Sequence, residues 1–252
     1  MALFQAGYKS AVLGKQMSFN AVFPDTVPAG NKKVPVVYLL HGLSDNHSIW
    51  LRHSNIERYA AAYGTAVIMP DGDRSFYTDM KHGGAWFKAI AEELPDFVNR
   101  TFQVSTERKD TFIAGLSMGG YGALKTALRY PERFAAAGIM SAVTDIIDKF
   151  STETFPSGMW HDIFGSPEET VANGNDIFTL IRELADKEVK PDIIHFCGNE
   201  DFLLKDNRKL RDALESLNWR NYLYQETPGA HSWEFWDRHI QDILKHFFKG
   251  DK

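Results

Sequence analysis

Cysteine is nearly absent from this sequence, which has only Cys197 among 252 residues. A single thiol excludes a disulfide framework and any metal site built on paired cysteines. The HExxH metal motif is missing too, as are the phosphate loops GxxxxGK[ST] and GxGxxG. We therefore expect no metal and no other cofactor, and we interpret Cys197 as a buried structural thiol.

The sequence also lacks a basic excess and any long apolar run. Its 28 Lys and Arg against 33 Asp and Glu give a net charge of −5, which does not favour a nucleic-acid partner. The longest apolar runs, at 34–40 and 134–140, are far short of the roughly 20 residues of a membrane span. The first residues show no basic start followed by an apolar run, so no secretory signal is expected and a cytoplasmic location is predicted.

What the sequence does contain is an alternation of apolar strand-like runs with helical patterns. This alternation predicts an α/β fold with a mostly parallel central sheet and helices on both faces. Pro95 should kink or divide the helix in which it lies. The expected strands are 8–13, 17–23, 34–40, 65–69, 110–116, 134–140, 192–197 and 221–226, and the expected helices are 54–63, 85–101, 118–130, 204–217 and 233–248.

One segment breaks this rhythm. Residues 145–190 separate two expected strands and form a longer connection than is usual in a compact domain. No repeat and no Pro/Gly/Ser-rich linker divides the chain, so we expect a single domain over residues 1–252 with 145–190 as a cap-like insertion near the active site. The residues leave open whether this insertion is a small helical excursion or a lid over substrate.

The most informative motif is Gly115-x-Ser117-x-Gly119. It follows an apolar strand and precedes a helix rich in Gly and Ala, which is the strand–turn–helix setting of a nucleophile elbow. A serine at the tip of such a turn exposes its hydroxyl, and the helix N-terminus favours a developing anion. We therefore predict that Ser117 is a nucleophile.

A serine hydroxyl needs a base to take its proton and an acid to orient that base. In this kind of fold the acid and then the histidine follow the serine along the chain. His231 follows the last expected strand and Asp201 the preceding one, so they are the predicted base and acid, with Asp145 as the second choice for the acid. His195 lies inside a strand and is interpreted as a core residue, whereas His239 on the last helix is expected at the surface.

An oxyanion hole requires two backbone N–H groups near the nucleophile. One is expected from Met118, directly after Ser117. The other is expected from the loop that follows strand 34–40, where Leu43 is the best candidate. His41 at the start of that loop is expected to hydrogen-bond within it.

Together these segments resemble the esterase D-like branch of the α/β-hydrolases, and among its members the bacterial tributyrin esterases. The resemblance implies an α/β-hydrolase fold, a triad of Ser117, Asp201 and His231, and oxyanion donors at Leu43 and Met118. It also suggests that Trp50, Tyr77, Trp86, Trp160 and Trp233 line the substrate pocket. The segments that carry it are LLHGLSDNHSIW (39–50), AVIMPDGDRSFYTD (66–79), AEELPDFV (91–98), TFIAGLSMGGYGALK (111–125), FCGNEDFL (196–203) and PGAHSWEFW (228–236).

The resulting prediction is a serine carboxylesterase for short-acyl or small aromatic esters. An acyltransferase uses the same acyl-enzyme and remains an alternative, as does a thioesterase similar to S-formylglutathione hydrolases. S-formylglutathione hydrolases carry a cysteine in the oxyanion loop. The corresponding loop at 42–45 has none, which counts against the thioesterase alternative. A non-enzymatic binding protein is disfavoured because the predicted triad is complete. The expected partner is a small ester substrate, and association into homo-oligomers is left open.

Overall fold

The computed structural model describes residues 1–25, 33–151 and 158–249. Within these ranges eight strands form one sheet in the order β1-β2-β4-β3-β5-β6-β7-β8. β1 pairs antiparallel with β2, and β2 with β4, while all other pairs are parallel, so the predicted mostly parallel α/β sheet is confirmed. The strands are β1 (Ala2–Lys9), β2 (Gln16–Phe23), β3 (Val36–Leu40), β4 (Ala66–Pro70), β5 (Thr111–Leu116), β6 (Ala136–Met140), β7 (Asp192–Gly198) and β8 (Tyr222–Thr227).

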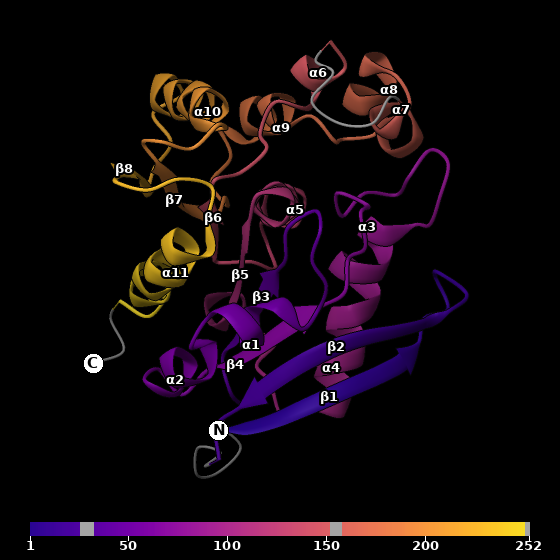
Figure 1. Cartoon of the computed structure of the whole chain (residues 1–252), viewed down its shortest axis with the longest axis vertical. Coiled ribbons are helices and arrows are strands. Elements are labelled where there is room, and N and C mark those ends of the chain that lie inside the picture. Colours follow the sequence, from indigo (N-terminus) through magenta and orange to yellow (C-terminus); the bar gives the residue numbers. More distant parts are fainter. Residues whose placement is uncertain (26–32, 152–157, 250–252) are drawn as a thin grey trace.

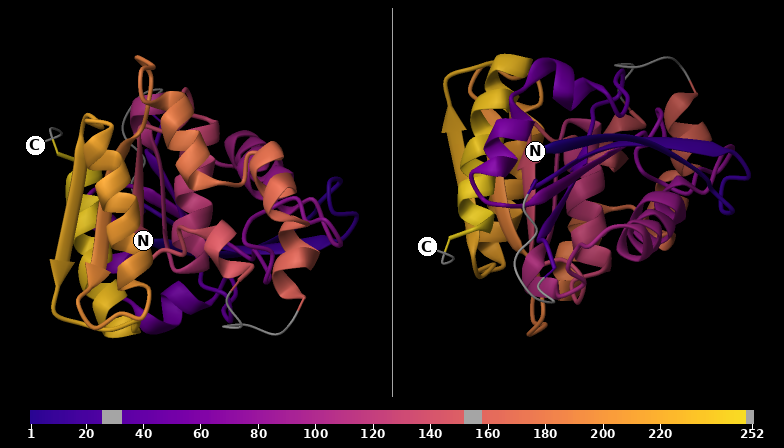
Figure 2. Two further views of the ribbon diagram at one scale, coloured as in Figure 1. Left: turned by 90° about the horizontal axis from the view of Figure 1, so that it is seen from above. Right: turned by 90° about the horizontal axis from the view of Figure 1, so that it is seen from below.

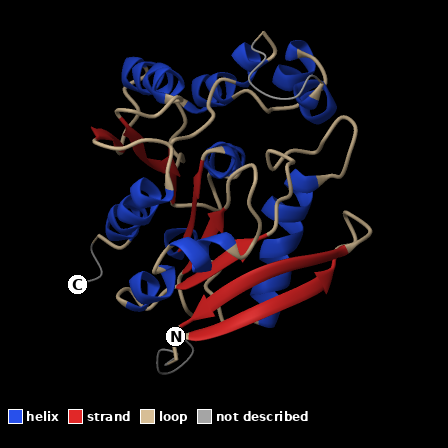
Figure 3. Cartoon of the chain, viewed as in Figure 1, coloured by secondary structure: helices blue, strands red, loops and turns tan. Residues whose placement is uncertain are grey.

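Helices cover both faces of this sheet (Figures 1 and 3). Figure 2 shows the β1–β2 hairpin and the pair β7 and β8 at opposite ends of the molecule. No helix of the described residues has the length and apolarity needed to cross a membrane. The helices are α1 (Ile49–His53), α2 (Ile56–Ala61), α3 (Trp86–Lys88), α4 (Leu94–Thr101), α5 (Met118–Arg129), α6 (Ile146–Lys149), α7 (Met159–Phe164), α8 (Pro167–Ala172), α9 (Ile177–Leu184), α10 (Leu204–Ser216) and α11 (Trp233–Phe247).

The central strands are apolar throughout because each is buried on both faces. Alternate residues of β3 illustrate the division. Tyr38 and Leu40 pack into the core that contains α5, whereas Val37 and Leu39 pack into the core that contains α11. Parallel strands also bring their carboxyl ends to one edge of the sheet, which is where ligand sites of α/β folds form.

The structure departs from the sequence prediction in several places. β1 lies at Ala2–Lys9 rather than at 8–13, and α1 was not predicted. The helix predicted at 85–101 is divided by a π-helical turn, Ala89–Glu93, which ends two residues before Pro95. A proline has no N–H and crowds the carbonyl four residues earlier, and the wider π turn accommodates both effects.

The segment 145–190 carries α6 to α9, with residues 152–157 outside the described ranges. Buried contacts tie the part before α9 to α5. The Tyr121 hydroxyl donates to the Asn175 carbonyl at 2.7 Å, and Lys125 Nζ donates to the Asn175 side chain at 3.1 Å. Whether this segment acts as a cap stays a prediction.

Candidate active site

Ser117 occupies the sharp turn between β5 and α5. Its φ of 53° and ψ of −118° lie in a region that residues other than glycine rarely adopt. Three backbone hydrogen bonds hold it there. The Ser117 N–H donates to the Met140 carbonyl at 2.9 Å, and the Ser117 carbonyl accepts from the N–H groups of Val143 at 3.3 Å and Tyr121 at 3.1 Å. The strained turn therefore leaves the hydroxyl at the end of the strand, as the motif predicts.

Both glycines of the motif are required by close backbone approaches. A Cβ at Gly115 would lie 2.3 Å from the Gly119 carbonyl oxygen. A Cβ at Gly119 would lie 2.6 Å from the carbonyl oxygens of both Leu40 and His41. Since real Cβ atoms do not approach backbone oxygens so closely, only glycine lets α5 pack against β3 and β5 at this point.

The structure brings His231 and Asp201 together from the loops after β8 and β7. His231 Nδ1 lies 3.0 Å from Asp201 Oδ2 and 3.1 Å from Oδ1. The Asp201 side chain is fully buried, and its Oδ1 also accepts from the Leu203 N–H at 2.8 Å. With Nδ1 engaged by the carboxylate, Nε2 is the ring nitrogen that remains for proton transfer.

The surroundings of Asp201 favour its ionised form. Burial alone would raise the pKa of this carboxyl group, but the hydrogen bond and charge of His231 act against it. Hydrogen bonds from the Ser141 hydroxyl and the Leu203 N–H add to the effect, so that the pKa of Asp201 is lowered below its ordinary value. The carboxylate can therefore stabilise a protonated His231.

The loops that carry the acid and the base are in direct contact. A Cβ at Gly198 would lie 2.2 Å from the Gly229 carbonyl oxygen, and the Glu200 N–H donates to that same oxygen at 2.9 Å. Gly229 has a φ of 148°, where a Cβ would also meet the Phe235 ring at 2.7 Å. These two glycines allow the close approach that brings His231 over Asp201.

The loop after β3 is held by His41. Its Nε2 accepts from the Gly72 N–H at 2.8 Å, so the ring proton is on Nδ1, which donates to the Gly42 carbonyl at 2.7 Å. In a trans peptide the C=O and the following N–H point in opposite directions. The Leu43 N–H is thus directed away from the His41 ring.

The two predicted oxyanion donors are both available for an incoming oxygen. Met118 is the first residue of α5, so its N–H has no acceptor within the helix. Among the described residues none accepts a hydrogen bond from the Leu43 N–H. A Cβ at Gly42 would lie 3.9 Å from the Ser117 Cβ, which shows how closely this loop approaches the nucleophile turn.

A cavity of about 710 Å³ contains Ser117 and His231 in its wall. Its volume is within the usual range of small-molecule sites. The apolar part of the wall comes from the loops after β3 and β7, from the end of β5 and from the start of α11: Leu43, Leu116, Phe202, Trp233 and Trp236. Ionisable side chains lie in the same wall at Asp45, His53, Arg74 and Glu234.

Only Trp233 of the five aromatic residues predicted for the pocket lines this cavity. Trp50 is buried beside it and donates its indole N–H to the Leu40 carbonyl at 3.1 Å. The fully buried Tyr77 hydroxyl donates to the His41 carbonyl at 3.0 Å, so Tyr77 supports the start of the loop after β3.

The other two aromatics lie farther from the cavity. Trp86 is buried under the Lys15 ammonium, which is 5.0 Å from its ring. Trp160 packs in a buried aromatic cluster with Phe76 and Phe164. Trp50, Tyr77, Trp86 and Trp160 are therefore buried side chains that do not line this cavity, and their contact with substrate stays a prediction.

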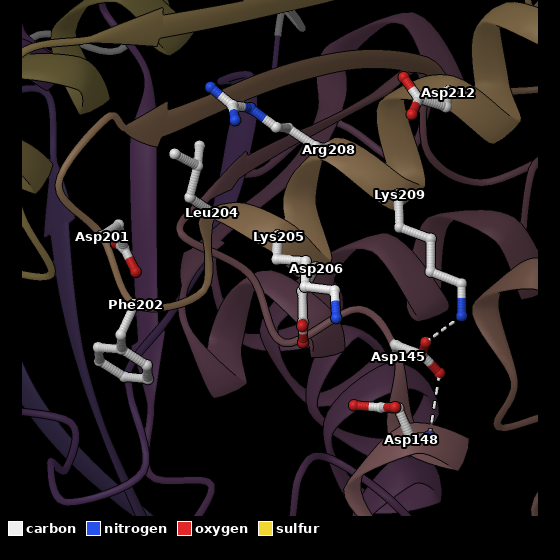
Figure 4. Close-up of a pocket in the computed structure, with 10 residues that line it drawn as sticks. All are labelled: Asp145, Asp148, Asp201, Phe202, Leu204, Lys205, Asp206, Arg208, Lys209 and Asp212. Carbon is white, nitrogen blue, oxygen red and sulfur yellow. Dashed lines mark hydrogen bonds and ion pairs between the residues drawn. The ribbon is translucent and has the colours of Figure 1, made fainter.

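Two further aromatic residues of the cavity wall, Phe202 and Trp236, were not predicted from the sequence. The Phe202 ring lies 4.5 Å from that of His231 and is 65% exposed. A large apolar side chain directly after the predicted acid was the available signal. Phe202 also lines a second cavity of about 750 Å³ along α10 (Figure 4). That cavity is lined mostly by charged side chains, including the pair of Lys209 and Asp145.

The structure also sorts the remaining candidates. Asp145 caps α6 and pairs with Lys209, so it does not contact His231. His195 is a fully buried core residue as predicted, and burial lowers its pKa to about 4. Cys197 is fully buried, as expected, and burial raises its pKa. His239 is buried against Phe196, so its prediction as a surface residue was wrong.

Comparison with known proteins follows from this geometry. The sequence profile of the family described as "Putative esterase" matches residues 10–247. The chain belongs to this esterase family. An acetyl esterase from Caldicellulosiruptor saccharolyticus is 30% identical over an alignment 260 residues long, gaps included, which covers 97% of this chain and 97% of the relative. This membership confirms the prediction of an ester hydrolase.

Two solved structures are similar along almost the whole length. A fluorophosphonate-binding serine hydrolase from Staphylococcus aureus superimposes with a TM-score of 0.89 at 32% identity, covering 98% of each chain. An S-formylglutathione hydrolase from the same organism gives 0.86 at 32% identity and the same coverage. The α/β-hydrolase fold and the resemblance to the esterase D-like branch, both stated from the sequence, are confirmed.

Proposed function

We propose that this protein is a serine carboxylesterase that hydrolyses short-acyl or small aromatic esters through Ser117, His231 and Asp201. One observation carries the proposal. The strained turn of Ser117 and the hydrogen-bonded pair of His231 and Asp201 come from three different loops and share the wall of one cavity. Such convergence of a nucleophile, a base and an orienting acid is the arrangement that acyl transfer requires.

In the acylation step, His231 Nε2 takes the Ser117 proton as Oγ attacks the ester carbonyl. The carbonyl oxygen becomes an anion and accepts hydrogen bonds from the Leu43 and Met118 N–H groups. The ester C–O bond then breaks, and the alcohol leaves with the proton from His231. Asp201 stabilises the imidazolium while it exists.

In the deacylation step, a water molecule replaces the alcohol. His231 removes a proton from this water as its oxygen attacks the acyl carbonyl. The bond to Ser117 Oγ breaks, Ser117 recovers its proton and the carboxylic acid is released. An alcohol in place of water would give acyl transfer by the same steps.

The short-acyl preference is supported by the relative named acetyl esterase and by the apolar cavity wall next to Ser117. Leu43 and Leu116 lie beside the nucleophile, and Trp233 and Trp236 lie beside the base. Aromatic side chains of this kind also suit a small aromatic acyl group.

The test is a series of p-nitrophenyl esters from acetyl to dodecanoyl, hydrolysed by the parent enzyme and by Ser117→Ala. Ser44→Ala is the matched control, because Ser44 lines the same cavity without sitting at the turn. We expect rates that are highest for the shorter acyl chains, that fall at least ~10³-fold in Ser117→Ala and that persist in Ser44→Ala. A folded Ser117→Ala variant with the parent's rate would refute the assignment.

Thioester hydrolysis is the second candidate, favoured by the similarity to the Staphylococcus aureus S-formylglutathione hydrolase. Comparing kcat/KM for S-formylglutathione and for p-nitrophenyl acetate distinguishes the two. We expect the oxygen ester to be preferred, and a thioester preference of tenfold or more would move the assignment. Adding glycerol to the same assay would reveal acyl transfer as a glyceryl ester product.

A further inference from the structure

The chain directly after β6 lies between the nucleophile and the acid. Met140 and Val143 hold the backbone of Ser117 from its two sides, as described above. Between them, the Ser141 N–H donates to the Phe196 carbonyl of β7 at 2.9 Å, which is the strand that leads to Asp201. Residues 140–143 therefore contact both the turn that carries Ser117 and the strand that leads to Asp201.

Ser141 itself has an unusual conformation. It is fully buried, and its φ of 49° lies in the left-handed region that disfavours a side chain. Such a conformation persists only where the surroundings enforce it. Here the next residue is clamped by Asn207, whose side chain accepts from the Ala142 N–H at 3.1 Å and donates to the Ala142 carbonyl at 3.0 Å.

The Ser141 hydroxyl has two polar partners. The Trp236 indole N–H donates to Ser141 Oγ at 3.1 Å. An indole N–H can only donate, so the hydroxyl acts as acceptor there and keeps its own proton for another group. The Asp201 carboxylate is the acceptor that we infer for this proton, because Ser141 is among the groups that lower the pKa of Asp201. The serine thus links the α11 indole to the acid.

Trp236 also contacts the base directly. Its ring is nearly perpendicular to the His231 imidazole, at 89°, with the ring centroids 4.9 Å apart. Trp236 is only 6% exposed, so the surrounding core fixes its position. Asp201 therefore neighbours His231, His231 contacts Trp236, and Trp236 is linked through Ser141 to Asp201.

We propose that Ser141 and Trp236 are positioning residues that hold the Asp201 carboxylate and the His231 imidazole in their catalytic alignment. This inference rests on the proposed function of Ser117, His231 and Asp201. The hydroxyl fixes the rotation of the carboxylate, and the indole fixes both the hydroxyl and the imidazole. Without the hydroxyl, the carboxylate keeps only His231 and the Leu203 N–H as partners among those described above.

The proposed role of Ser141 also has a consequence for the pH dependence of activity. A hydrogen bond to a carboxylate is strongest when no cation neutralises the carboxylate. The Ser141 bond therefore stabilises the state with neutral His231 more than the state with imidazolium. Removing it favours the imidazolium, so the acid limb of the activity profile should move to higher pH.

Other ionisable groups face this pair but are unchanged in the variants proposed below, so a difference between variant and parent reports on the hydroxyl. On the His231 side they are Asp45, His53, Arg74 and Glu234. On the Asp201 side they are Cys197, Lys205, Asp206, Arg208, Lys209 and Asp212, with Asp145 and Asp148 across the second cavity.

The experiment compares Ser141→Ala and Ser141→Gly with the parent enzyme. Both variants remove the hydroxyl, but glycine also relieves the strain at a φ of 49°, so Ser141→Gly should be at least as stable to heat as Ser141→Ala. We expect both to lower kcat on p-nitrophenyl acetate by about 10- to 100-fold, as loss of a group that orients a catalytic side chain usually does, with KM changed less than about threefold. The acid limb of kcat/KM should move to higher pH in both.

The matched control is Ser105→Ala. The Ser105 hydroxyl donates to Asp110 Oδ2 at 2.7 Å, so this change also removes a serine-to-aspartate hydrogen bond, which is partly buried. Ser105 precedes β5 and therefore lies at the opposite end of that strand from Ser117. We expect its kcat and its pH profile to equal those of the parent.

Trp236→Phe provides a second test, which decides the matter if the Ser141 variants do not fold. It removes the indole N–H and keeps an aromatic ring, so kcat should fall in the same direction by a smaller factor. Folded Ser141 variants, or failing those a folded Trp236→Phe, with the parent's kcat and pH profile would overturn the inference. If the parent itself showed no activity that depends on Ser117, the proposed function would fail instead.

Discussion

The support of the oxyanion loop by His41 leads to a quantitative prediction. His41 is 1% exposed, and its ring holds the Gly42 carbonyl at 2.7 Å and the Gly72 N–H at 2.8 Å. The substitution His41→Ala removes both bonds. It leaves the Gly72 N–H buried without its partner and releases the peptide that presents the Leu43 N–H.

Two separate magnitudes follow from this geometry. One buried polar group left unsatisfied costs about 1–3 kcal/mol, and the space left by the ring adds to it, so His41→Ala should lose about 2–5 kcal/mol of stability. Misdirecting one oxyanion donor costs about 10²–10³ in kcat. Since that donor acts mainly on the transition state, KM should change much less than kcat.

The assay is kcat and KM on p-nitrophenyl acetate at a temperature where circular dichroism shows the variant to be folded. His47→Ala is the control, because His47 belongs to the same loop but faces Asp71 at 3.5 Å rather than Gly42. A folded His41→Ala enzyme with kcat within about threefold of the parent would refute the view that this ring directs the Leu43 N–H.

Three further predictions concern stability and substrate contact. Gly119→Ala places a Cβ 2.6 Å from two carbonyl oxygens and should lower Tm by about 5 °C or more, whereas Gly7→Ala, with 3.5 Å of room, should change it little in the same melting experiment. Buried, neutral His195 has a pKa of about 4, whereas a histidine of the unfolded chain has a pKa near 6.5, so the folded protein binds this proton less readily. The free energy of unfolding should therefore fall by about 3 kcal/mol as the pH drops from about 6.5 to 4. His195→Gln should reduce this pH dependence in urea titrations. Phe202→Ala removes a 65% exposed ring beside His231, so it should raise KM for aromatic esters several-fold while leaving Tm within about 2 °C, and an unchanged KM would exclude Phe202 from substrate binding.

The parts of the fold that were predicted correctly are those with a strong local signal. β3 and β5 are continuous apolar runs, and Ser117 lies at a turn marked by small residues on both sides. Asp201 and His231 follow the next suitable strands, so the rule that parallel strands share a carboxyl edge was enough to place them together. The structure does bring these two side chains into contact, at 3.0 Å.

The parts that were missed depend on contacts between distant segments. Tyr77, Trp50 and Trp233 are all large aromatic residues. The sequence around each one does not show whether its ring packs in the core or lines the cavity. Their hydrogen bonds to His41 and Leu40 become visible only once the loops are folded. The role proposed for Ser141 could not be predicted from the sequence either. A left-handed conformation is usually marked by a glycine, and this position is a serine.

The buried position of His239 shows a related limit. His239 on the last helix was predicted to lie at the surface, yet its ring stacks on Phe196 and its Nε2 lies 2.8 Å from the Thr227 hydroxyl. The inner face of α11 is set by the sheet against which it packs. Helical spacing alone identifies that face less well than the contacts do.

The central claim is that Ser117 is the nucleophile, and covalent labelling tests it most directly. A fluorophosphonate probe should react once per chain: the bond from Ser117 Oγ to phosphorus forms, the P–F bond breaks, fluoride leaves and His231 takes the serine proton. Peptide mass mapping should place the adduct on Ser117, and esterase activity should be lost in proportion to labelling. Full activity in completely labelled enzyme, or an adduct on another residue that accounts for the lost activity, would contradict the account.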